Sequence, residues 1–168
     1  LFKMLFNEIE YRKDKLQRAG VSSLSAYKKA GYEDLPNIIL IIDNFTALAE
    51  WYLQEDDILL QLCRDGLSVG ISIVMTNGQT SGLNFKYLAN FDEKISLYCV
   101  NEAEYSNLFG KSKLWLPKIP GRCLVEQNDE ITQCQIYQPF KGNMEIERKD
   151  NILEFVETIA KKEKERAK

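Results

Sequence analysis

The feature that most constrains the fold is a short apolar run, Ile38-Ile-Leu-Ile-Ile42, which follows Pro36 and ends at an acidic residue. A run of this length without polar alternation is typical of a parallel strand whose two faces are both covered. A second run of this kind, Ile71–Met75, follows after a segment long enough for one helical crossover. The sequence therefore predicts an α/β domain built on a parallel sheet.

Polar residues follow both runs: Asp43 and Asn44 the first, Thr76 and Asn77 the second. Open α/β sheets bind ligands outside the carboxyl ends of their strands, where these tips would meet. In nucleotide hydrolases an Asp at this place helps to hold magnesium, and a neighbouring polar tip contacts phosphate or water. We interpret Asp43 and Asn44 as candidate catalytic residues, Asp43 also as the magnesium ligand, and Thr76 and Asn77 as cofactor contacts. The alternative that Asp43 merely caps the next segment stays open.

Asn44 stands where a nucleotide hydrolase often has a water-activating Glu. An amide can hydrogen-bond a water but cannot accept a proton as a carboxylate does, so efficient hydrolysis is not expected. Gly110-Lys111-Ser112 superficially ends a phosphate-binding loop, but the glycine required five residues earlier is Tyr105. We reject it, and the chain contains no other such loop. Arginines that could contact phosphate, although surface or salt-bridged roles explain each more readily, are Arg12, Arg64 and Arg122.

Composition excludes several classes of function. The net charge of −3 does not favour electrostatic binding of nucleic acid, and the charged tail 161–168 has both signs, as a solvated helix end has. No histidine and no CxxC pair is present, which argues against structural zinc. No apolar stretch approaches the roughly 20 residues needed to span a bilayer. Aromatic residues that could line an exposed groove for a partner peptide, unless they pack into the core, are Trp51, Tyr52, Trp115 and Tyr137.

The remaining periodicities predict helices and strands around these runs. Expected helices cover residues 2–18, a short stretch within 21–30, 55–65 starting at Glu55-Asp56-Asp57, and 101–109. Expected strands are 95–100 and a hairpin of 122–126 and 131–137. A capping box of Asn151 with Glu154 predicts where a terminal helix begins.

The ordered series of segments resembles that of FtsK/SpoIIIE-type ATPases. The segments that carry the resemblance are Glu8–Arg12 leading to Leu16, Ala19–Val21 with Leu24 and Tyr27, Leu35–Asp43 as a Walker B strand, Gly66–Ile71 with Thr76-Asn77, and Leu116-Pro117 with Pro120–Arg122. Within that family the chain is most similar to the EssC/YukB branch, the coupling ATPases of type VII secretion. The resemblance implies a three-layer RecA-like (P-loop NTPase) parallel sheet, truncated at its N-terminus, with a C-terminal β-hairpin and terminal helix. Residues 1–142 would be the C-terminal part of one module, and residues 143–168 a terminal helix or linker.

The same resemblance implies cofactors and partners. ATP and magnesium would bind the intact module, weakly or not at all in this one. The partners would be small helical WXG-type secretion substrates and other ATPase modules of the same chain, in a parent that can form a hexamer. The parent would act at the cytoplasmic face of the bacterial cell membrane.

The departures from the family pattern indicate a degenerate module. Asn44 replaces the catalytic Glu, Asn77 replaces a Gln, and Leu67 stands where an Arg is common. The phosphate-loop segment would precede Leu1. We therefore expect a role in substrate recognition or regulation, with the fragment alone inactive. Two alternatives stay open: a hydrolytically active module of the same machine, and a DNA-translocating motor of the FtsK class, against which the acidic balance argues.

Overall fold

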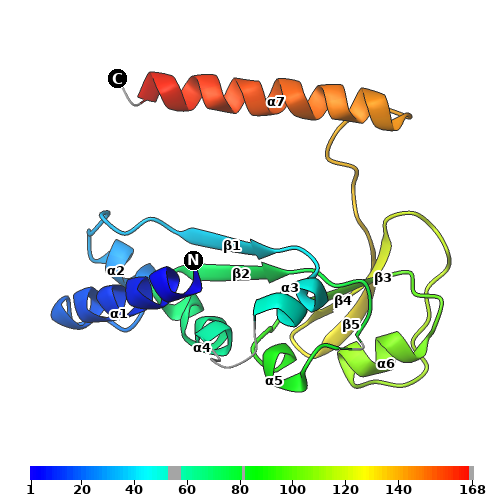
Figure 1. Ribbon diagram of the computed structural model, residues 1–168, viewed down its shortest axis with the longest axis horizontal. Coiled ribbons are helices and arrows are strands. Elements are labelled where there is room, and N and C mark those ends of the chain that lie inside the picture. The colour runs from blue at the N-terminus through cyan, green and yellow to red at the C-terminus, as the bar shows by residue number, and fades with distance from the viewer. Residues whose placement is uncertain (53–57, 81, 167–168) are drawn as a thin grey trace.

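The two apolar runs form a parallel pair, as predicted. β1 (Ile38–Ile42) lies beside β2 (Ile71–Met75), with Ile38 opposite Ile71 and Ile42 opposite Met75. The computed structural model describes residues 1–52, 58–80 and 82–166 (Figure 1). Because the strands are parallel and in register, their carboxyl ends meet at one edge of the sheet.

Helices cover one face of this pair. They are α1 (Phe2–Arg18), α2 (Leu24–Lys29), α4 (Ile58–Asp65) and the 3₁₀ turn η1 (Leu67–Val69). The apolar core between helices and sheet includes Leu59 and Leu62 of α4, which are 0% exposed. The sequence predicted that both faces of the pair are covered. On the face away from the helices, however, Ile39 and Ile41 are 66% and 68% exposed. Only one face carries helices among the described residues.

Helix α3 (Phe45–Tyr52) was not predicted; it begins directly after the tip of β1. Its hydrophobic anchor is Phe45, which is 1% exposed and contacts the ring of Tyr87 edge to face at 5.1 Å. Helix α4 lies within the predicted range 55–65, and its buried residues are Leu59 and Leu62. Its predicted acidic start, Glu55-Asp56-Asp57, lies outside the described residues.

A second, antiparallel sheet follows. Strand β4 (Arg122–Gln127) lies between β3 (Lys94–Leu97) and β5 (Glu130–Gln135), and the β4–β5 hairpin is confirmed. Its two turn residues, Asn128 and Asp129, have φ values of 52° and 63°, which suits the tight turns of two-residue hairpins. Strand β3 is shorter than predicted. Helix α5 (Phe85–Leu88) lies between β2 and β3 and so connects the two sheets, whereas α6 (Ala103–Phe109) lies between β3 and β4. Helix α6 contributes Tyr105 and Phe109 to a small second core.

The terminal helix α7 (Glu145–Arg166) begins six residues before the predicted capping box, so that prediction of its start is wrong. Asn151 lies inside the helix and donates from Nδ2 to Lys141 O at 2.8 Å. The cap is Glu147, whose Oε2 accepts the N–H groups of Asn143 at 2.8 Å and Met144 at 3.3 Å. Figure 1 shows α7 apart from the other elements, at the end of a connecting segment. Within the described ranges, no helix is both long and apolar enough to cross a membrane.

Candidate functional site at the strand tips

The four residues predicted at the carboxyl edge lie together. Thr76 is the centre of the group, because its Oγ1 donates to Asp43 Oδ1 at 2.5 Å and accepts the N–H of Asn44 at 3.1 Å. The backbone completes the junction, since Phe45 N–H donates to Thr76 O at 2.9 Å. The Thr76 hydroxyl therefore uses both its donor and one of its acceptor positions to join the two tips.

Asn44 adopts a backbone conformation that few residues favour. Its φ is 61°, in the left-handed region, where Asn is enriched because its short polar side chain bonds locally. From there it starts α3: its backbone O accepts Leu48 N–H at 3.3 Å, and its Oδ1 faces Ala47 N–H at 3.4 Å. The capping role considered for Asp43 thus belongs to Asn44, and the turn itself explains an Asn at this position.

Asn77 is also held within the fold. Its Oδ1 accepts both the N–H and the hydroxyl of Thr46 at 3.0 Å, and its Nδ2 donates to Gln79 O at 2.5 Å. These bonds tie the tip of β2 to the first turn of α3. Like Thr76, Asn77 uses its side chain in hydrogen bonds of this junction.

Sequence reasoning missed a neighbouring group on the loop after β2. Glu104, in the first turn of α6, accepts the N–H and the hydroxyl of Thr80, both at 2.5 Å, and Asn107 Nδ2 donates to the same hydroxyl at 3.1 Å. The Thr80 hydroxyl and then its N–H hold the pKa of Glu104 below the ordinary value. The available signal was an acidic residue at a helix start, which the sequence analysis used elsewhere but not here.

Asp43, the predicted magnesium ligand, keeps one carboxylate oxygen available. Its side chain is exposed, and its second oxygen, Oδ2, has no hydrogen-bond partner among the described residues. No cluster of three His, Cys, Asp or Glu side chains that could hold a metal exists in the described part of the chain. The residues fit magnesium only as it binds with a nucleotide, through one carboxylate, several waters and phosphate oxygens.

Comparison with known proteins shows to which family the chain is related. No family model matches the chain. The protein "ESX secretion system protein EccC" of Geobacillus thermodenitrificans is 33% identical over 157 residues, which are 94% of this chain and 10% of that protein. The solved structure "EssC (ATPases 2 and 3)" of the same organism superposes with a TM-score of 0.81 at 32% identity, over 90% of this chain and 29% of that one. The chain is homologous to the ATPase modules of EssC and EccC.

The EssC/EccC relationship confirms the RecA-like (P-loop NTPase) fold class and implies that nucleotide binding is a property of these modules in general. The chain spans about a tenth of the length of its curated relative. At 20% identity, a structure of Thermomonospora curvata EccC (ATPases 2 and 3) in complex with a signal sequence peptide shares the fold, with a TM-score of 0.75 over 94% of this chain and 29% of that one.

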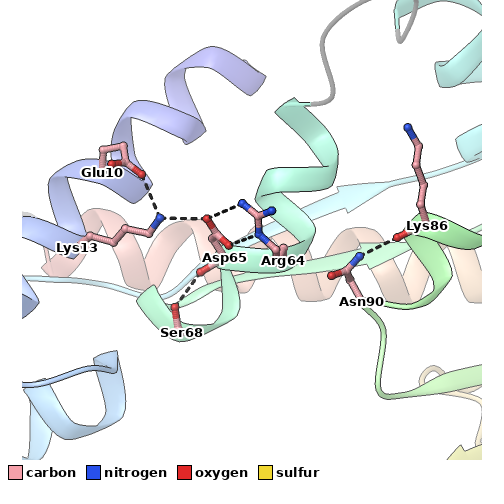
Figure 2. Close-up of polar contacts among 7 residues, drawn as sticks. All are labelled: Glu10, Lys13, Arg64, Asp65, Ser68, Lys86 and Asn90. Carbon is pink, nitrogen blue, oxygen red and sulfur yellow. Dashed lines mark hydrogen bonds and ion pairs between the residues drawn. The ribbon is translucent and has the colours of Figure 1, made fainter.

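None of the three arginines contacts the strand tips. Arg12 is 1% exposed and bonds to Glu8, Pro36 O and Val69 O, so it is a buried structural group rather than the surface residue expected. Figure 2 shows Arg64 turned toward Asp65, whose carboxylate also binds Lys13 of α1. These two cations hold the pKa of Asp65 below its ordinary value, Arg64 more than Lys13. Arg122 bonds to glutamines of β5.

Two of the four aromatic residues suggested for a partner groove are exposed. Trp115 is 63% exposed and Tyr137 is 90% exposed, on the loop before β4 and on the segment after β5. The side chains of Trp51 and Tyr52 lie outside the described part of the structure. Aromatic side chains are enriched in the buried cores of protein–protein interfaces, which makes these two residues candidates for such a contact.

Proposed function

We propose that this chain is part of the cytosolic motor and coupling ATPase of type VII protein secretion, in a module that serves substrate recognition or regulation rather than hydrolysis. The homology to EssC and EccC modules supports the assignment to this machine. One observation supports the choice of role: the side chains of Thr76 and Asn77 are hydrogen-bonded to Asp43 and to Thr46 of α3, and Asn44 lies in the left-handed turn that begins α3. Asp43 Oδ2 remains without a hydrogen-bond partner among the described residues.

The proposal assigns each tip residue a role. Asp43 would contribute Oδ2 to magnesium when a nucleotide is bound, and magnesium would neutralise charge on the phosphates. Asn44 occupies the catalytic position without a proton acceptor, and its left-handed turn disfavours a Glu there. Thr76 and Asn77 would transmit the state of the nucleotide edge to α3, because they bond to both. The cradle for the phosphates would come from a segment outside these 168 residues.

The partners we propose follow from the relatives. A related EccC structure holds a signal sequence peptide. By analogy this module would meet small helical WXG-type substrates or the neighbouring ATPase modules of its parent, for which we propose a hexameric assembly. The exposed Trp115 and Tyr137 are the side chains that favour such a contact. The net charge of −3 gives no support to DNA as the partner.

The test is steady-state ATP turnover of the parent protein, with Asp43→Ala compared with Asp14→Ala. Asp14 is an exposed carboxylate of α1, paired with Arg18, and so serves as the matched control. We expect turnover attributable to this module to be slow and both variants to lie within about twofold of the wild type. Robust turnover that Asp43→Ala abolishes and Asp14→Ala preserves would overturn the regulatory role and favour the active-ATPase alternative.

If hydrolysis is slow, a nucleotide-binding assay shows whether the module binds nucleotide without hydrolysing it or whether Asp43 has no part in binding. If the module binds nucleotide without hydrolysing it, Asp43→Ala weakens magnesium-dependent binding of a fluorescent ATP analogue, and Asp14→Ala does not. A variant with unchanged binding would show that Asp43 only bonds Thr76. Salt-dependent DNA binding, with affinity falling steeply as salt rises, would instead favour the translocase alternative.

A further inference from the structure

Two side chains of α6 hold the loop that follows β2. Glu104 Oε2 accepts the N–H and the hydroxyl of Thr80, both at 2.5 Å. Asn107, one turn further along α6, donates from Nδ2 to the same hydroxyl at 3.1 Å. The Thr80 hydroxyl is therefore both donor and acceptor, and an ionised acceptor makes stronger hydrogen bonds than a neutral one. These bonds join positions that are 24 and 27 residues apart in the chain.

Helix α6 gives Glu104 a fixed position. Tyr105, the next residue, is 0% exposed, and its hydroxyl accepts the N–H of Cys99 at 2.8 Å. Phe109, one turn later, is buried in the same small core as Tyr105. Because packing fixes α6, the carboxylate of Glu104 can hold its partner in one place.

The turn between β2 and Thr80 is held by hydrogen bonds rather than by packing. Gly78 and Gln79 are exposed, and a Cβ added to Gly78 would meet no atom within 4 Å in the described part of the chain. Within the turn, Asn77 Nδ2 donates to Gln79 O at 2.5 Å. Segments with few packing contacts open most readily, so the position of this turn depends on the bonds at its two ends.

The first end of the turn is bonded to α3. Asn77 Oδ1 accepts the N–H and the hydroxyl of Thr46, both at 3.0 Å. Thr46 lies in the first turn of α3, where backbone N–H groups have no partner within the helix, so its N–H relies on Asn77. Thr76, the residue before Asn77, donates to Asp43 Oδ1. The turn is thus bonded to α6 at one end and to α3 and the strand tips at the other.

We propose that Glu104 is a positioning residue for the candidate site: through Thr80 it fixes the turn that orients Asn77, and thereby the start of α3 and the strand tips. This inference rests on the proposed function, because it takes the strand tips as the nucleotide edge of the module. It adds a route by which the second core acts on that edge, through hydrogen bonds that are contiguous from α6 to α3. A displacement of α6 would reach the tips through Thr80.

Amide hydrogen exchange of the 168-residue chain, followed by NMR without nucleotide, tests this role. Glu104→Ala removes the acceptor, whereas Glu104→Gln keeps a carbonyl oxygen that can accept the same two bonds. The control is Glu102→Ala, because Glu102 is an exposed carboxylate at the start of α6 whose side chain does not cap the helix. The reporter is the N–H of Thr46, and the internal reference is the N–H of Leu48, which bonds within α3 to Asn44 O.

We expect the Thr46 N–H to exchange at least about fivefold faster in Glu104→Ala, the change that corresponds to losing one hydrogen bond. In Glu104→Gln and in Glu102→Ala, its exchange should stay within about twofold of the wild type. The Leu48 N–H and the amides of α6 should change less than the Thr46 N–H. Thr80→Val, which removes the hydroxyl and keeps the shape, should accelerate the Thr46 N–H at least about twofold.

Unchanged exchange of the Thr46 N–H in Glu104→Ala or in Thr80→Val would overturn the proposal. Equal acceleration of the amides of α3 and α6 would also overturn it, because Glu104 would then be a general support of the fold. If Glu104→Ala does not fold, Thr80→Val decides alone. Because the exchange is measured without nucleotide, its result is independent of the ATP-turnover test of the proposed function.

Discussion

Arg12 offers the sharpest test of how this fold is held together. Its guanidinium is 1% exposed and makes three contacts: Glu8 Oε1 at 2.7 Å, Pro36 O at 2.8 Å and Val69 O at 3.1 Å. The two carbonyls precede β1 and β2, so one side chain of α1 ties the amino ends of both parallel strands. Replacing it with Leu keeps most of the aliphatic packing and removes the donors.

The expected loss of stability follows from the hydrogen-bond acceptors that the Arg12→Leu substitution leaves without their donor. The carbonyl of the buried Val69 loses its donor inside the fold, which costs about 1–3 kcal/mol. Pro36 lies in an exposed segment where water can replace the bond, and Glu8, whose side chain is 34% exposed, can be rehydrated. Together we expect Arg12→Leu to lower the free energy of unfolding by about 2–4 kcal/mol, out of the roughly 5–15 kcal/mol typical of a domain.

The matched control lies on the same helix. Arg18 forms the same i,i+4 pair, with Asp14 at 2.8 Å, but its side chain is 78% exposed, so Arg18→Leu should cost no more than about 0.5 kcal/mol. Urea unfolding followed by far-ultraviolet circular dichroism measures both. With an m value of about 2 kcal/mol/M, the midpoint should fall by about 1–2 M for Arg12→Leu and by about 0.3 M or less for the control. Equal losses in the two variants would refute the structural role of Arg12.

Two further predictions concern a glycine and a carboxylate. Gly70 has a φ of 82°, and a Cβ there would lie 2.1 Å from Leu24 Cδ2, so Gly70→Ala should lower the free energy of unfolding by about 2–4 kcal/mol in urea. Gly20→Ala, at a φ of 70° with open space around it, should cost only about 1 kcal/mol; similar losses would contradict the clash. Because the bonds from Thr80 lower the folded pKa of Glu104, its contribution is full above the ordinary value of 4.5 and is lost as the pH falls through the folded pKa. The difference in unfolding free energy between wild type and Glu104→Gln should therefore shrink on acidification, and a difference independent of pH from 7 to 3 would contradict this.

Local sequence patterns were sufficient to predict those elements whose position is set by the burial of apolar side chains or by a tight turn. Helices α1 and α4, the two parallel strands and the hairpin around Asn128 and Asp129 were all predicted from periodicity and turn chemistry. The start of α7 was not predicted correctly, because the same capping-box pattern can occur inside a longer helix as well as at its N-terminus. Helix α3 was missed because its first turn is fixed by bonds to β2, which lies far away in the sequence.

The candidate site divides in the same way. The apolar runs and the polar residues after them were enough to predict that Asp43, Asn44, Thr76 and Asn77 would meet, because parallel strands in register bring their carboxyl ends to one edge. The role of each side chain at that edge could be read only from the folded molecule. Hydrogen bonds join Thr76 to Asp43 and Asn44, and Asn77 to Thr46 of α3, with partners 31 to 33 positions apart. Periodicity records which face a residue is on, whereas the choice of bonding partner depends on distances that exist only after the strands pair.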